Sequence, residues 1–109
     1  DHNYAEAAQL LNRSLATDPA NAWALTNAAY SELQLRQFDK AAEHALRVHE
    51  LPHQGFTNAH VIAGYALDAL GKHEAALGQW ELYLKEDPTG PNAAKAKAEV
   101  ARLSNKGGN

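Results

Sequence analysis

The chain has 109 residues, of which 45% are hydrophobic and 21% are charged, and its formal net charge is −3. This composition is typical of one soluble globular domain, and it excludes the dense basic face of a nucleic-acid-binding protein. No apolar run approaches the roughly 18 residues that a membrane span needs. Cysteine is absent, which excludes disulfides and thiolate metal sites. Methionine is absent too, and the chain begins inside a helical pattern, so we expect a piece of a longer protein.

Three segments of the chain share one pattern, in which a stripe of apolar and small residues is closed by a proline. Their equivalent alanines stand 34 and 35 residues apart: Ala7, Ala41 and Ala76. Their closing prolines are Pro19, Pro52 and Pro88. A period of this length indicates a repeat architecture in which neighbouring units bury one another's faces.

Within each segment, apolar residues recur every three or four positions, which indicates helices. Helix-forming residues dominate, and no alternating run suggests a strand. The pattern predicts an all-α fold of six helices, at 3–18, 21–35, 38–51, 56–70, 73–86 and 91–104. Asn21 is a plausible cap for the second helix. Short connections force neighbouring helices to pack antiparallel. The polar, glycine-rich tail 105–109 is predicted to be disordered.

The third copy carries the most informative residues, which are Ala63, Gly64, Gly71, Ala76, Trp80, Asp87 and Pro88. With them the sequence resembles the tetratricopeptide repeat family, a helix–turn–helix unit of about 34 residues. The second copy departs from the family pattern, because Arg36 stands at the turn glycine and Glu32 at an apolar position. The resemblance implies a right-handed superhelix, an α-solenoid of antiparallel helix pairs. The resemblance divides the chain into a half repeat 3–19, a repeat 21–52, a repeat 56–88 and a capping helix 91–104. The predicted apolar stripe of the capping helix consists of Ala94, Ala98, Ala101 and Leu103.

The resemblance also implies that the concave side, formed by the first helix of each repeat, binds a peptide or protein segment. The candidate groove residues are Trp23, Thr26, Tyr30, Gln34, Asn58, Val61, Tyr65, Lys95 and Arg102. The alternative is that Trp23 and Tyr30 are core residues. Some family members grip a terminal carboxylate with lysine, asparagine and arginine. Here Tyr30 and Tyr65 replace the asparagines, and Ile62 replaces a basic residue, so we expect that mode to be absent.

The histidines provide the strongest hint of chemistry, because His49 and His53 flank Glu50 in the spacing of a zinc protease helix. Pro52 argues against that site, since both ligands must lie on one continuous helix. We interpret His49 and His53 as surface residues at a helix end, His44 as solvent-facing, and His60 and His73 as packing residues. We therefore predict no metal site, no cofactor and no enzymatic activity.

The leading hypothesis is a non-catalytic scaffold for protein–protein interaction. The alternative is an assembly module that forms a homo-oligomer, with a homodimer through the N-terminal helix and its residues Tyr4, Leu10 and Leu11. A metal protein or enzyme based on the histidines is the distant third. A pull-down that compares the wild type with the variant Tyr30→Ala plus Tyr65→Ala separates the first two hypotheses. Titration with zinc, followed by calorimetry, tests the third.

Overall fold

The computed structural model describes residues 3–107 of the chain. In this range it contains no strand and six helices: α1 (Tyr4–Thr17), α2 (Ala22–Gln34), α3 (Phe38–Val48), α4 (Asn58–Ala69), α5 (His73–Glu86) and α6 (Ala93–Gly107). The predicted all-α fold of six helices is thereby confirmed. Helix α6 continues through 105–107, where we predict disorder. The rest of that predicted tail, Gly108 and Asn109, lies outside the described residues.

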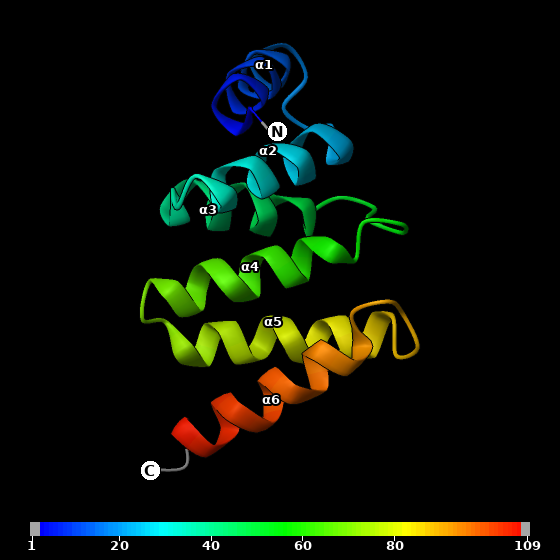
Figure 1. Cartoon of the computed structure of the whole chain (residues 1–109). Coiled ribbons are helices and arrows are strands. Elements are labelled where there is room, and N and C mark those ends of the chain that lie inside the picture. Colours follow the sequence, from blue (N-terminus) through cyan, green and yellow to red (C-terminus); the bar gives the residue numbers. More distant parts are fainter. Residues whose placement is uncertain (1–2, 108–109) are drawn as a thin grey trace.

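The helices stack in chain order, each antiparallel to the one before it, and the two ends of the chain lie at opposite ends of the stack (Figure 1). The molecule measures 43 × 26 × 26 Å. Extensive packing joins consecutive helices, and α2 also contacts α4, so the first helices of adjacent repeats share one surface. Among the described residues, no helix is both long and apolar enough to span a bilayer.

Small residues dominate the interior, because closely stacked helices leave little room between their backbones. Ala41 and Ala76, two of the repeat-defining alanines, are fully buried. The largest buried side chains are Trp80 and Tyr83 of α5, and they anchor the core of the C-terminal half. Helix α6 buries Ala93, Ala96 and Leu103. Ala94, Ala98 and Ala101 are exposed, so the stripe predicted for this helix is wrong apart from Leu103.

The helix ends follow local chemistry. The Asn21 side chain accepts a hydrogen bond from the Ala24 amide at 3.0 Å, which confirms the predicted cap of α2. The turn between α4 and α5 places Gly71 at a φ of 80°, a left-handed conformation that suits glycine. The equivalent turn between α2 and α3 holds Arg36 at 63°. Its guanidinium lies 5.5 Å from the centre of the Phe38 ring, a contact that helps to hold this unfavourable conformation.

Candidate functional site

The face shared by α2, α4 and α6 carries the exposed aromatic residues of the predicted groove. Trp23 is 57% exposed, Tyr30 45% and Tyr65 38%. In this structure, therefore, Trp23 and Tyr30 are not core residues. Gln34, Asn58, Lys95 and Arg102 are exposed as well, and Val61 is half-buried.

Thr26 is the exception among the predicted groove residues. Its side chain is buried, and its hydroxyl donates a hydrogen bond to the Ala22 carbonyl at 2.8 Å. A hydroxyl that bonds to the preceding helical turn is not available to a ligand. Thr26 therefore belongs to the packing of α2 and not to its exposed face.

A hollow of about 460 Å³ opens where the end of α2 meets the middle of α4. It is lined by Leu33, Gln34, Arg36, Phe38 and Tyr65. Two predicted groove residues from different repeats, Gln34 and Tyr65, thus line one concavity. A larger hollow of about 600 Å³ lies among α1, α2 and α3, and its lining includes none of the exposed aromatic residues.

Charged side chains of α4 and α6 form a network of ion pairs next to Tyr65. The Lys95 ammonium lies 5.8 Å from the centre of the Tyr65 ring and 3.0 Å from a Glu99 oxygen. Arg102 pairs with both Glu99 and Asp68 at 2.6 Å. Because both cations already have anionic partners, this face offers aromatic rings and amides more readily than free charge.

The Asp68 carboxylate is the centre of this network, since His73 Nδ1 also lies 2.5 Å from it. Burial by itself acts to raise the pKa of Asp68, but the hydrogen bonds from Arg102 and His73 outweigh that effect and lower it. His73, predicted to be a packing residue, is half-buried and in addition orders this carboxylate.

The residues predicted for self-association differ in exposure. Leu10 is 57% exposed, whereas Leu11 is half-buried and packs against the core. Tyr4 is half-buried too, and its ring meets the Tyr30 ring edge-on at 5.9 Å. Of the three, Leu10 is therefore the residue most available to a second copy.

A buried carboxylate occupies the position at which the second repeat departs from its expected pattern. Glu32 is fully buried, and it accepts hydrogen bonds from His44 Nδ1 at 2.7 Å and Asn12 Nδ2 at 3.2 Å. This interaction draws His44 inward, so its side chain is only 12% exposed and the prediction that it faces solvent is wrong. The three polar groups satisfy one another where an apolar side chain was expected.

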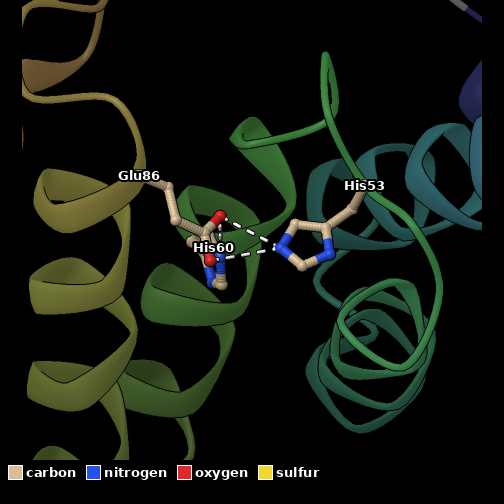
Figure 2. Close-up of side chains that lie close together, drawn as sticks. All are labelled: His53, His60 and Glu86. Carbon is tan, nitrogen blue, oxygen red and sulfur yellow. Dashed lines mark hydrogen bonds and ion pairs between the residues drawn. The ribbon is translucent and has the colours of Figure 1, made fainter.

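The structure gathers a second group of residues that sequence reasoning missed. His53 from the α3–α4 loop, His60 from the first turn of α4 and Glu86 from the last turn of α5 meet at one point (Figure 2). Glu86 Oε1 lies 3.0 Å from His53 Nε2 and 2.9 Å from His60 Nε2. Since α4 and α5 are antiparallel, the start of one helix lies beside the end of the other, and predicted helix ends alone could have suggested this pair.

The other ring nitrogens of the two histidines are also occupied. His53 Nδ1 lies 2.8 Å from the Leu51 carbonyl oxygen, and His60 Nδ1 lies 2.9 Å from the Gln79 side-chain oxygen. His60 is buried, as its equivalence to Leu25 predicts. The Leu51 carbonyl and the Glu86 carboxylate raise the pKa of His53. Burial acts to raise the pKa of Glu86, but its hydrogen bonds from His53 and His60 lower it.

His49 completes the cluster as a neighbour. Helix α3 ends at Val48, so His49 and His53 do not share a continuous helix, as Pro52 predicts. The His49 ring stacks on His60 with centres 3.8 Å apart, and its Nε2 is buried without a hydrogen-bond partner among the described residues. Burial, followed by the nearby histidines, lowers the pKa of His49 to about 4, which keeps it neutral at pH 7. The interpretation of His49 and His53 as simple surface residues is therefore wrong.

Antiparallel helix pairs stacked in chain order define an α-helical solenoid. No model of a known protein family matches the chain. Its sequence is 30% identical over 104 residues to human (Homo sapiens) tetratricopeptide repeat protein 28 and 29% identical to the mouse (Mus musculus) protein of the same name. Each alignment covers 95% of this chain, which spans 4% of the length of these curated relatives.

Solved structures that contain tetratricopeptide repeats (TPRs) are also similar to this chain. The second TPR domain of human RPAP3, determined by NMR in complex with the HSP70 peptide SGPTIEEVD, has a TM-score of 0.80 at 25% identity. That match covers 93% of this chain and 81% of the other. A structure of MamA (MSR-1 C2) has a TM-score of 0.77 at 27% identity. This match covers 93% of the present chain and 56% of the MamA chain. Sequence and structure together support the assignment of the chain to the tetratricopeptide repeat family, and with it a protein-interaction scaffold.

Proposed function

We propose that the face formed by α2, α4 and α6 binds a segment of another protein, in extended or helical form, without catalysis. The observation that carries the proposal is the shared hollow, in which Gln34 of one repeat and Tyr65 of the next line a single concavity. The exposed rings of Trp23 and Tyr30 extend this surface along α2. Exposed aromatic residues beside polar neighbours are typical of the sites at which interfaces concentrate their binding energy.

The chemistry of the face favours apolar and aromatic side chains in the bound segment. Lys95 and Arg102 are paired with acidic residues, so they contribute less to an anionic ligand than free cations would. Ile62 is 3% exposed and leaves no basic group where the carboxylate-gripping members of the family need one. The RPAP3 domain was solved with an HSP70 peptide. Because the basic group is missing from this chain, we propose that the bound segment is an internal part of the partner and does not present a terminal carboxylate.

The test uses peptides selected from a phage-displayed random library against the wild-type chain. We expect a selected peptide to lose at least about tenfold in affinity, or 1–2 kcal/mol, when Tyr30→Ala and Tyr65→Ala are combined. Calorimetry measures the affinity, and circular dichroism confirms that helicity is retained.

The matched control combines Leu46→Ala with Leu82→Ala. These leucines are 36% and 39% exposed on α3 and α5, the second helices of the two repeats. The control is expected to bind like the wild type. If the selected peptides bind the double tyrosine variant as tightly as the wild type, the proposed face is the wrong one.

Self-association is the second candidate function, and the exposure of Leu10 is the observation that favours it. Helix α1 packs chiefly against α2, and Leu10 lies beside the half-buried Leu11 on its surface. A second copy that covers this strip would bury apolar area that is otherwise in contact with water.

A further inference from the structure

Residues from three structural elements, one of them distant in the sequence from the other two, converge on one point at the junction of the two complete repeats. His53 lies in the α3–α4 loop, and His60 and Glu86 lie on α4 and α5 (Figure 2). Their ligand atoms lie within 4.8 Å of one another. We propose that His53, His60 and Glu86 bind one zinc-class divalent cation, with Zn²⁺ as the reference ion, through the two Nε2 atoms and a carboxylate oxygen.

The positions of the protons favour this site. Carbonyl oxygens accept hydrogen bonds but cannot donate them, so the contacts of His53 with Leu51 and of His60 with Gln79 place a proton on each Nδ1. Each Nε2 is then directed at the Glu86 carboxylate, to which it donates a hydrogen bond when it too carries a proton. A bound Zn²⁺ would displace the Nε2 protons, so that each Nε2 lone pair and a carboxylate oxygen coordinate the ion.

The spacing of the ligand atoms fits a small metal ion. Glu86 Oε1 lies 3.0 Å from His53 Nε2 and 2.9 Å from His60 Nε2. Ligand atoms that surround zinc tetrahedrally at about 2.0–2.1 Å lie roughly 3.3 Å from one another. The two carboxylate–imidazole separations therefore need to grow by only a few tenths of an ångström, and the two Nε2 atoms lie within 4.8 Å of each other. Two imidazoles with one carboxylate favour zinc and its neighbours over magnesium or calcium, which prefer oxygen ligands.

The surroundings resemble those of established histidine–metal sites. Ligating histidines usually donate their second N–H to a carbonyl or carboxylate, which fixes the ring, and both Nδ1 atoms have such an acceptor here. His60 is 1% exposed and forms the inner wall, and the His49 ring stacks on it. The side chains of His53 and Glu86 are 22% and 30% exposed, so water can reach the remaining coordination position.

The expected consequence is mechanical. A bound ion would join the loop between α3 and α4 to the end of α5 and so fix the angle between the two repeats. The site lies at the loop end of α4, whereas Tyr65 of the proposed binding face lies five residues beyond His60 in the same helix. Ions that bind the folded chain raise its stability, so occupancy is measurable as a rise in Tm.

The experiment titrates Zn²⁺ into the tag-free chain at pH 7.5 and follows heat and Tm, with Mg²⁺ as the control ion. We expect one Zn²⁺ per chain, a Tm that rises with Zn²⁺ and no response to Mg²⁺. His53→Ala and Glu86→Gln change partly exposed groups, and each should weaken Zn²⁺ binding at least tenfold and remove the rise in Tm. His60 is not substituted, because it is part of the core.

The matched control is His73→Ala, which removes a histidine that lies beside another carboxylate, Asp68, outside the cluster. It should keep the Zn²⁺ affinity and the rise in Tm. Nitrogen-15 spectra should show Zn²⁺-dependent shifts at Nε2 of His53 and His60 and none at His44. The absence of Zn²⁺ binding, or binding that survives His53→Ala, would overturn the proposal. Neither result bears on peptide binding at the aromatic face.

Discussion

Gly64 illustrates how a single residue sets the distance between two helices. It lies on α4, where the indole of the fully buried Trp80 from α5 covers the backbone. A Cβ atom at this position would lie 2.6 Å from Trp80 Cε2 and 2.7 Å from its Nε1. Neither distance is compatible with ordinary van der Waals contact, and the closely packed core leaves the indole little room to move.

We expect Gly64→Ala to destabilise the chain, although alanine is the better helix former. The gain in helix propensity is about 1 kcal/mol, whereas overpacking of a close-packed core costs about 1–3 kcal/mol. Thermal unfolding measures the balance as a fall in Tm.

Gly78→Ala is the matched control, because a Cβ there meets nothing within 4 Å and the residue lies in α5. That variant should gain up to about 1 kcal/mol from propensity alone. Equal shifts of Tm for the two variants would show that the indole does not restrict position 64.

At the scale of helices, a charged network connects α4 to α6. Arg102 of α6 pairs with Asp68 of α4 at 2.6 Å, and Lys95 lies over the Tyr65 ring. Leu103 of α6 is buried, α6 packs mainly on α5, and the ion pairs with Asp68 help to orient the helix that ends the described array. The network is partly open to solvent, since Arg102 is 42% exposed, so its contribution to stability is modest.

We expect this contribution to depend on pH. Because the folded-state pKa of Asp68 lies below its ordinary value, the stabilisation is complete above the unfolded pKa and is lost as the pH falls through the folded pKa. At pH 7 the wild type should exceed Asp68→Asn in stability by about 0.5–1 kcal/mol, a value discounted for solvent screening. The difference in Tm between the two proteins should shrink between pH 5 and about pH 2.

The comparison with Asp68→Asn cancels the titration of the other carboxylates, which the two proteins share. If the two proteins are equally stable at pH 7, Arg102 and His73 do not stabilise the Asp68 carboxylate.

At the scale of the molecule, an open stack of helices leaves its end faces without a further repeat in this structure. Helix α6 presents Lys95, Lys97 and Arg102 among its exposed residues, which suits contact with water. Helix α1 presents Leu10, which is 57% exposed, as large an exposed fraction as that of Trp23. Stacked repeats usually cover such apolar positions with a polar capping helix or with another unit.

We therefore predict that the chain forms a dimer about a two-fold axis through α1. Analytical ultracentrifugation should show dimer for the wild type and monomer for Leu10→Lys, because a buried lysine in the interface lacks a partner. Leu46→Lys, a substitution at an exposed leucine of α3, is the control and should leave the dimer intact. A wild-type chain that sediments as a monomer at every concentration would contradict this prediction.

Periodicity in the sequence was sufficient to predict the six helices, their order and the small residues between them. Each of these depends on neighbours three or four positions away or on one repeat length. The proline at 52 likewise predicted that His49 and His53 do not share a helix. The sequence placed Tyr30 and Tyr65 at equivalent positions of successive repeats, and the structure then decided that both are exposed.

Tertiary structure decided which polar residues meet. Glu86 stands 26 residues from His60 and 33 from His53, so no local pattern relates the three. The antiparallel packing of α4 on α5, together with the path of the loop that carries His53, brings them together. Glu32 likewise finds its partner, His44, on the next helix. The spacing of apolar residues along the chain predicts which face of a helix is buried. Hydrogen bonds and metal coordination depend instead on the direction and distance between side chains, and these are defined only once the helices are packed.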